Sequence, residues 1–184
     1  MLLPLMMAGG DAEGAGAGLE GVPPEYLQAV TQAGSICTEI TPSLIAGQIE
    51  AESGWDPTAV SPAGAQGIAQ FMPATWKSNG IDANGDGVAD PFDPIDAIAS
   101  QGQFMCGLVE TVKAYVASGQ AVGNVVDLAL AAYNAGPGAV QQHRGIPPYS
   151  ETQTYVAKIK KLAGKYTQGS VAASSVVAGA QKYL

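Results

Sequence analysis

The chain has 184 residues, of which 47% are hydrophobic and 13% charged, so it can form one core of ordinary size. Its formal net charge of -8 argues against nucleic acid as a partner, because phosphate binding needs a basic face, and against electrostatic binding to anionic lipid. An uncharged or zwitterionic polymer fits this charge better.

Residues 1–21 predict a flexible N-terminal segment or linker. The opening MLLPLMMA is apolar, but it is much shorter than the roughly 20 residues that span a bilayer, and it lacks the basic start of a signal peptide. It is compatible with the stub of a removed anchor or signal, or with an expression start. Residues 9–21, GGDAEGAGAGLEG, are rich in Gly and Ala, as flexible linkers are.

The rest of the chain predicts helices and almost no strands. Proline and capping residues mark the expected helix starts, and glycine marks most of the ends. The expected helices run from Pro24 to about Gly34, over 42–53, from Pro73 to about Gly80, from Pro94 to Gly119, over 125–135, and from Ser150 to about Tyr166. We therefore expect a mainly α fold, a single helical domain over about residues 22–168.

The stretch QIEAESGW, residues 48–55, contains two glutamates that helical geometry separates. At 100° per residue, Glu52 lies in the middle of an apolar face, and Glu50 points roughly the opposite way, into solvent. That face is formed by Leu44, Ile45, Gln48 and Ile49. A half-buried carboxyl has a raised pKa, which suits a general acid near neutral pH. The helix alone is equally compatible with Glu52 as a local cap or pairing group.

Three further stretches combine small residues with polar side chains. They are SPAGAQGIAQFMPATW (61–76), AAYNAGPGAV (131–140) and PPYSETQTY (147–155). Close backbone approach and amide side chains suit hydrogen bonding to sugar hydroxyls and acetamido groups. Each stretch alone also fits ordinary local structure: a Gly-rich turn, a helix C-cap and a helix start with a carboxylate near the helix dipole.

The segment IDANGDGVADPFD, residues 81–93, fits a twelve-residue calcium loop with Asp in place of the terminal Glu. The expected ligands are Asp82, Asn84, Asp86, Val88, Asp90 and Asp93. Against calcium, Pro91 interrupts the loop, and Asp93 is short for a bidentate ligand and can also cap the next helix. A surface loop rich in Asp, Asn and Gly is the alternative. Bound calcium would be structural and remote from proton transfer.

Together these stretches resemble the soluble lytic transglycosylase family over roughly residues 25–165. ESGWDPTAVSPAGAQGIAQFMPATW is similar to the family's ES…GAQGLMQ…PAT block, and LAAYNAGPGAV to its AYNAG block. The chain departs from the commonest pattern at Ile68-Ala69, where Leu-Met is typical. The resemblance implies a lysozyme-like fold of the goose-type or SLT class. It also implies cleavage of the β-1,4 bond between N-acetylmuramic acid and N-acetylglucosamine in peptidoglycan, with 1,6-anhydro ends.

The resemblance assigns Glu52 the role of catalytic acid and then base, in chemistry that requires no cofactor. The residues expected at the substrate are Ser53, Gln66, Gln70, Tyr133, Asn134, Glu151 and Tyr155. A hydrolytic muramidase is the main alternative, because some lysozyme-like relatives with similar blocks hydrolyse the bond. A glycan-binding module that has lost its acid and a calcium-stabilised scaffold for a secretion partner are two non-enzymatic alternatives.

The two cysteines and the C-terminus give the expected context. By count alone, Cys37 and Cys106 are compatible with one disulfide or with two buried thiols, and an extracytoplasmic function favours the disulfide. Residues 169–184 predict a linker, and VVAGAQKYL (176–184) resembles the opening helix of NlpC-type cysteine endopeptidase domains. We expect a monomeric front part of a two-domain bacterial cell-wall enzyme, secreted or wall- or membrane-associated, working with secretion or conjugation machinery.

Overall fold

Proline begins four of the seven α-helices in the computed structural model, which describes residues 19–180 and their side chains up to Tyr166. A proline is well tolerated in the first turn, because its missing N–H would have no helical partner there. The elements are η1 (Pro24–Tyr26), α1 (Leu27–Ala33), α2 (Pro42–Glu52), α3 (Pro73–Asn79), α4 (Pro94–Ala117), α5 (Val125–Ala135), α6 (Pro137–His143) and α7 (Ser150–Ala180). Over the described range there is no strand, and Gln66 makes isolated bridges to Val60 and Phe71. The expected mainly α fold is confirmed.

Two helices differ from the sequence prediction. Gly136 ends α5 with a φ of 86°, as expected, but Pro137 then starts α6, a helix that the sequence pattern did not predict. Helix α7 continues to Ala180, beyond the end expected near Tyr166 and through the beginning of the predicted linker. That stretch contains no proline to stop a helix. The predicted flexible segment 1–21 lies almost entirely outside the described residues.

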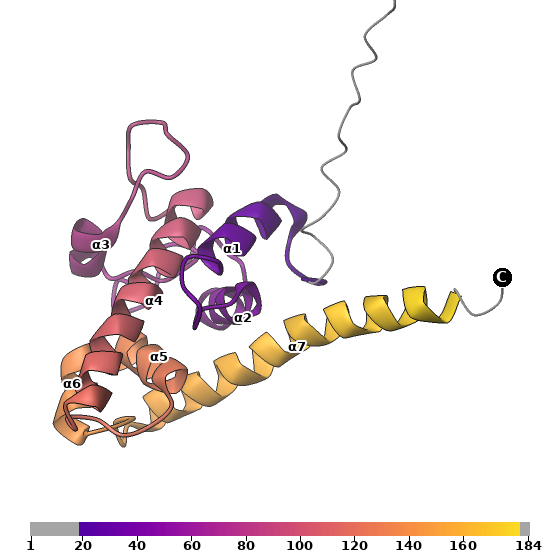
Figure 1. The fold of residues 1–184 in the computed structure, drawn as a ribbon. Helices are drawn as coiled ribbons and strands as arrows, with labels where there is room; N and C mark the ends of the chain where they lie inside the picture. The colour runs from indigo at the N-terminus through magenta and orange to yellow at the C-terminus, as the bar shows by residue number, and fades with distance from the viewer. Residues whose placement is uncertain (1–18, 181–184) are drawn as a thin grey trace, which may run out of the picture.

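The close packing of α2 against α7 positions the later site. These two helices form the most extensive contact between elements, and α7 then projects past the body of the domain (Figure 1). Gly47 allows this approach, since a Cβ atom there would lie 2.7 Å from the backbone nitrogen of Ala163. The core around the interface is apolar and fully buried, with Ile45, Ile49 and Ile159 at 0% exposure.

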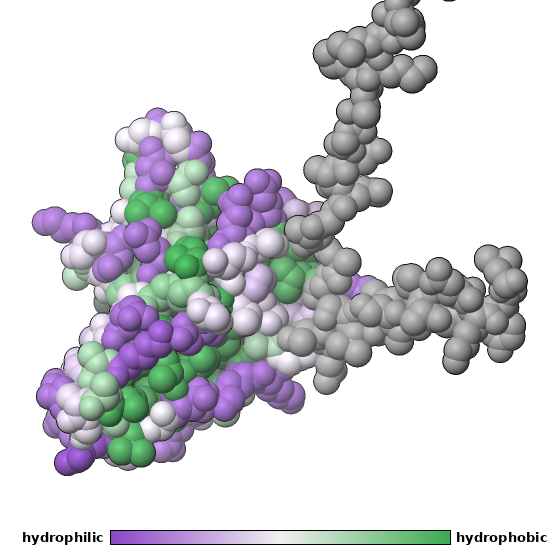
Figure 2. Space-filling view, in the orientation of Figure 1, coloured by the Kyte–Doolittle hydropathy of each residue, from purple (hydrophilic) through white to green (hydrophobic). Residues whose placement is uncertain are grey.

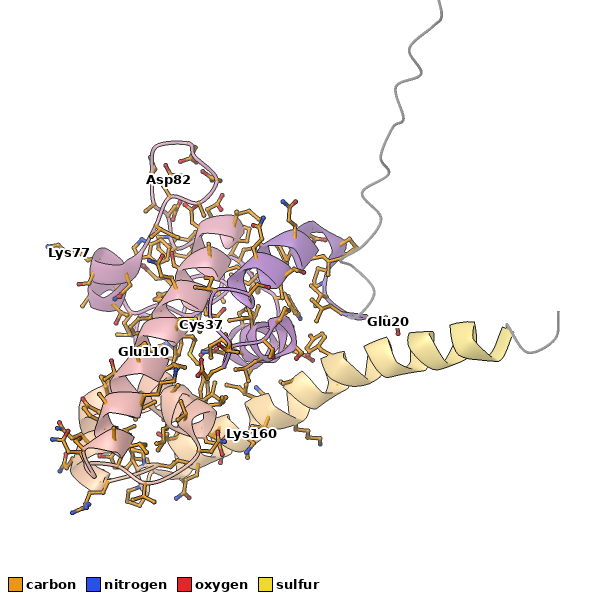
Figure 3. All side chains as sticks on the ribbon, viewed as in Figure 1. Glu20, Cys37, Lys77, Asp82, Glu110 and Lys160 are labelled. Atoms are coloured by element: carbon orange, nitrogen blue, oxygen red, sulfur yellow. A yellow bond between two sulfur atoms is a disulfide. The ribbon has the colours of Figure 1, made fainter. Side chains whose placement is uncertain are left out.

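A disulfide holds the segment between α1 and α2 against α4, and a buried carboxylate holds the loop between α3 and α4. Cys37, between α1 and α2, is bonded to Cys106 of α4, which confirms the predicted disulfide (Figure 3). The loop between α3 and α4 projects from the body and carries Asp82 (Figure 3). Fully buried Asp96 anchors this loop, because its two carboxylate oxygens accept backbone N–H bonds from Ala83 and Asn84 and from Asp90.

On the face in Figure 2, hydrophilic residues cover much of the rim, and apolar residues gather toward the middle and lower part of the body. None of the helices in the described residues is long and apolar enough to cross a membrane.

Candidate active site

Glu52 is the last residue of α2, and its carboxylate meets α7. The Tyr155 hydroxyl donates a hydrogen bond of 2.5 Å to Oε1 of Glu52. One turn earlier in α2, Nε2 of Gln48 donates a bond of 3.1 Å to the same hydroxyl oxygen. Gln48 is fully buried, while Tyr155 and Glu52 are half-buried. A polar chain therefore runs from the core to the carboxylate.

The environment of Glu52 favours its neutral form. Burial raises the pKa of Glu52 from its ordinary value of 4.5 to about 7, against the opposing effects of the Tyr155 hydrogen bond and the positive charge of Lys158. Lys158 itself donates a bond of 3.0 Å to the carbonyl oxygen of Ala51. A carboxyl with a pKa near 7 populates both protonation states at neutral pH. Glu52 can therefore donate a proton and later accept one.

Two tyrosines next to Glu52 remain protonated donors. Tyr133 of α5 donates a bond of 2.8 Å to the carbonyl oxygen of Ala69. Burial raises the pKa of Tyr133 well above its ordinary value, and the negative charge of Glu52 raises it further. Burial and then Glu52 raise the pKa of Tyr155 in the same direction. Neither hydroxyl ionises near neutral pH, so both can orient neighbouring acceptors.

Two polar side chains predicted to bind substrate hold the Gly-rich loop, residues 61–72 between α2 and α3. Ser53 Oγ donates a bond of 2.8 Å to the carbonyl oxygen of Ile68. The Gln70 amide donates to the carbonyl oxygens of Gly67, at 2.9 Å, and Ala59, at 3.2 Å, while its backbone has a φ of 51°. These bonds use both N–H groups of the Gln70 amide. Its carbonyl oxygen is the polar atom that it can present to a ligand.

A cleft of about 250 Å³ lies beside Tyr133. This Tyr133 cleft is lined by Gln70, Phe71, Met72, Thr75, Phe104, Tyr133, Asn134, Gly136 and Pro137. An open recess of about 370 Å³ lies beside Tyr155 on α7. This Tyr155 recess is lined by Ser150, Glu151, Thr154, Tyr155 and Lys158. Aromatic faces mixed with amides, hydroxyls and charged groups are the lining that sugar rings and their substituents require.

The remaining predicted substrate residues lie in different settings. Asn134 lines the Tyr133 cleft, and its Oδ1 accepts a bond of 2.7 Å from the Thr152 hydroxyl. Glu151 is exposed in the Tyr155 recess. Gln66 is half-buried, and its backbone N–H and C=O pair with those of Phe71 at 2.9 and 3.0 Å. Their roles toward a substrate stay predictions.

Sequence reasoning missed Gln48, Phe104 and Lys158 as members of the site. Gln48 was recognisable as an amide on an apolar face four residues before Glu52, whereas Phe104 and Lys158 carry no local pattern. The expectation for Glu50 was wrong. Its carboxylate accepts bonds from Tyr166, at 2.6 Å, and from Lys165, at 3.1 Å, so it is not a free surface charge.

The predicted calcium loop is held by its own hydrogen bonds. Asp82 accepts backbone N–H bonds from Gly85 and Gly87, at 2.7 and 2.8 Å. The Asn84 amide donates to Asp86 and to Asp93, and Asp93 also caps α4 through the N–H of Ile95 and Asp96. Within the described residues, no group of three or more acidic, histidine or cysteine side chains is arranged to hold a metal ion.

Known proteins match most of the helical region. The sequence model of the family described as "Transglycosylase SLT domain" matches residues 25–156. Over 64 residues, the chain is 42% identical to membrane-bound lytic murein transglycosylase B of Escherichia coli strain K12. This stretch covers 33% of the chain and 18% of that protein.

Two solved structures share the fold. One is an inactive mutant of the lytic transglycosylase Slt of Pseudomonas aeruginosa, with a TM-score of 0.58 and 24% identity, covering 78% of this chain and 23% of that one. The other is the 70 kDa soluble lytic transglycosylase of Escherichia coli, with a TM-score of 0.56 and 26% identity, covering 77% of this chain and 24% of that one. The chain thus spans at most about a quarter of the length of these relatives.

Proposed function

Because the chain belongs to the transglycosylase SLT domain family, we propose that it is a peptidoglycan lytic transglycosylase. It cleaves the β-1,4 bond between N-acetylmuramic acid and N-acetylglucosamine and leaves a 1,6-anhydro-muramyl end. The observation that carries this proposal is the Glu52 carboxyl, whose pKa is about 7 and which lies close to Tyr133 and Tyr155. Tyr133 lines one recess and Tyr155 lines another, and both recesses have linings that suit a glycan strand.

Glu52 supplies both proton transfers of the reaction. In its neutral form it donates its proton to the glycosidic oxygen as the bond from that oxygen to the anomeric carbon breaks. The 6-hydroxyl of the muramyl ring then attacks the anomeric carbon, and the Glu52 carboxylate takes the proton from this hydroxyl. The protein returns to its starting state without consuming water. A pKa near the working pH suits both steps.

The other carboxylates near Glu52 in the sequence are engaged elsewhere. Glu50 is bonded to Lys165 and Tyr166, and Asp56 accepts bonds from the backbone and hydroxyl of Thr58. Two-carboxylate glycosidases need a second acid placed across the scissile bond as base or nucleophile. Attack by the sugar's own hydroxyl needs none. This supports a transglycosylase over a muramidase, for which exposed Glu151 in the Tyr155 recess is the candidate second carboxylate.

The Tyr133 cleft provides the groups that recognise an N-acetylated sugar. Phe104 and Tyr133 lie with ring centroids 5.6 Å apart and offer aromatic surface to a sugar face. The Gln70 carbonyl oxygen and the Asn134 amide offer polar contacts for hydroxyl and acetamido groups. Holding the ring in this way lowers the barrier by placing the reacting atoms before the bond breaks.

Product analysis tests the proposed function. Purified peptidoglycan is treated with the protein and with Glu52→Gln, and the fragments are analysed by mass spectrometry. We expect anhydro-muramyl ends, one water lighter than reducing ends, which disappear with the variant while glycan binding remains. Reducing ends would instead establish a muramidase. Binding without any cleavage by the wild-type protein would establish a glycan-binding module.

We propose in addition that residues 82–93 bind a structural calcium ion. The ligand spacing and the turn that Asp82 forms with Gly85 and Gly87 support this. The Asn84 amide nitrogen lies between the carboxylates of Asp86 and Asp93. Rotating the amide would present its carbonyl oxygen to a cation, at the expense of the bond of 2.8 Å that this oxygen accepts from the N–H of Asp86. Thermal unfolding with calcium and with a chelator tests the proposal. An equal unfolding temperature in both solutions would rule out a stabilising ion.

We infer that the protein works outside the cytoplasm on peptidoglycan strands. The Cys37–Cys106 disulfide supports this, because such bonds persist in oxidising compartments. The expected secretion or conjugation partner and the expected NlpC-type domain stay predictions. The residues that suggest that domain, 176–184, have no described side chains, and the last of them lie outside the described residues.

A further inference from the structure

Gln48 is a fully buried polar residue in the apolar interface between α2 and α7. Its Nε2 lies 3.1 Å from the Tyr155 hydroxyl oxygen and 3.6 Å from the sulfur of Met105. It stands four residues before Glu52, so both side chains project from the same face of α2 toward α7. Gln48 touches the hydroxyl that in turn touches the carboxylate.

The stability of the fold does not explain a glutamine at this position. The carbonyl oxygen of Gln48 is buried and has no hydrogen-bond partner among the described residues. A buried, unsatisfied carbonyl is unfavourable compared with an apolar side chain of the same volume. A methionine or leucine would fill the space without that penalty. What distinguishes this amide is its contact, because Nε2 bonds to the hydroxyl that holds Glu52.

The hydrogen-bond directions show what the amide contributes. A tyrosine hydroxyl has one proton and accepts through its lone pairs. Gln48 Nε2 can only donate, so it occupies a lone pair of the Tyr155 oxygen and leaves the proton of Tyr155 to point at Glu52. Oε1 of Glu52 is then held by Tyr155. Oε2 is left as the oxygen that exchanges a proton with a ligand.

We propose that Gln48 is a positioning residue, which acts through the Tyr155 hydroxyl to fix the orientation of the Glu52 carboxylate for proton transfer. This inference deepens the proposed function and rests on it for its effect on turnover. Its effect on the carboxylate can be measured without any substrate.

The charged and titratable groups that face Glu52 determine how the loss of the Gln48 amide changes the pKa of Glu52. Tyr155 and Lys158 face it from α7, and Tyr133 faces it from α5. A donor bond from Gln48 polarises the Tyr155 O–H and strengthens its bond to the ionised carboxylate, because linked hydrogen bonds reinforce one another. Removing the amide therefore destabilises ionised Glu52, so its pKa rises.

The test is a double-mutant cycle of Gln48→Met and Tyr155→Phe, read out by carbon-13 NMR titration of the Glu52 carboxyl. With Gln48→Met alone we expect a higher pKa for Glu52 and an alkaline limb of the pH–rate profile that moves upward. We also expect a kcat about tenfold lower, less than the ~100-fold that a 1 Å misplacement of reacting groups can cause. In the Tyr155→Phe background, Gln48→Met should change the pKa of Glu52 no further.

A second buried glutamine provides the matched control. Gln101 of α4 is fully buried, and neither polar atom of its side chain has a partner among the described residues. Gln101→Met should leave the pKa of Glu52 unchanged. At about pH 4, where Glu52 is protonated in both proteins, Gln48→Met should unfold at or above the wild-type temperature.

Three results would overturn the proposal. These are an unchanged pKa of Glu52 in Gln48→Met, an equal change with and without the Tyr155 hydroxyl, and a lower unfolding temperature of Gln48→Met at about pH 4, where Glu52 is protonated. If the wild-type protein releases no product but the pKa coupling is present, the proposed function fails while the positioning contact stands.

Discussion

At the scale of single residues, two glutamates of one helix experience opposite environments. Glu52 ends α2 beside a tyrosine hydroxyl, and burial dominates its titration. Glu50 lies on the other side of the helix, where Lys165 and Tyr166 bind its carboxylate. The two side chains belong to the same last turn of α2 but point to different sides of it, so the difference comes from the groups that α7 presents to each. Their pH dependences should have opposite signs.

Replacing Glu52 by Gln removes a carboxyl whose pKa is raised in the folded state. Between the unfolded pKa of about 4.5 and the folded pKa of about 7, the folded state keeps a proton that the unfolded state releases, so stability falls as the pH rises. The variant lacks this loss. We expect it to be more stable than wild type by roughly 1–3 kcal/mol at about pH 8 and equally stable at about pH 4. Thermal unfolding at both pH values measures this, and a pH-independent difference would contradict it.

Glu50→Gln should behave in the reverse manner. Burial works against ionisation of Glu50, but the Tyr166 hydrogen bond and Lys165 outweigh it and hold the pKa of Glu50 below its ordinary value. Its stabilisation is therefore present above about pH 4.5 and is lost as the pH falls through the lowered pKa. We expect the variant to be less stable by about 1 kcal/mol at neutral pH. Urea unfolding at about pH 7 and about pH 3 should show the difference at the higher pH alone.

At the scale of elements, the Gly-rich loop depends on the loop before α4. Gly67 has a φ of +73°, and a Cβ atom there would lie 1.8 Å from the carbonyl oxygen of Pro91. The two loops therefore touch through backbone atoms at a position where a side chain cannot fit. Asp96 fixes the second loop, so it also supports the first.

Gly67→Ala should consequently destabilise the protein by more than about 2 kcal/mol and reduce cleavage, because a loop must move as well as accept a strained φ. Gly64→Ala is the matched control. Its φ is +88°, but among the described residues no heavy atom beyond its chain neighbours lies within 4 Å of the added carbon, so it should lose about 1 kcal/mol from backbone strain alone. Unfolding and turnover of both variants measure the loop contact. Equal losses of stability and turnover in the two variants would show that the contact between Gly67 and Pro91 contributes to neither.

Helix boundaries were predictable because the groups that set them are local. Thr41 accepts from the N–H of Leu44, and Asp93 and Asn124 cap α4 and α5 with their side chains, as their positions before each helix indicate. Helix α6 was not predicted, again because of a local signal. Gly136 correctly ended one helix, but a proline that follows such a glycine can also begin the next one.

The partners of the site residues were not predictable, because they come from distant parts of the chain. Gln48 and Tyr155 are 107 positions apart, and Glu50 and Lys165 are 115 apart. Periodicity assigned Glu52 to the packed face of α2 but could not show which group would meet it there. Likewise, the spacing of Asp96 within α4 gave no indication that its carboxylate would bind the backbone of a loop that precedes it.

At the scale of the whole molecule, the disulfide is the main covalent constraint on the described fold. It joins residues 69 positions apart, for which chain entropy predicts a stabilisation of roughly 4 kcal/mol. We expect the double variant Cys37→Ser with Cys106→Ser to lose about 2–4 kcal/mol of unfolding free energy. Reductant should lower the stability of the wild-type protein toward that of the variant and leave the variant unchanged. Urea unfolding with and without reductant makes the comparison.

The disulfide also determines when the protein reaches its full stability against unfolding. A newly made chain in a reducing compartment holds two thiols, and its fold is then easier to open and easier for proteases to remove. Once the same chain arrives where thiols oxidise, it becomes durable. For the proposed peptidoglycan-cleaving function, the more stable form is then the one found outside the cytoplasm.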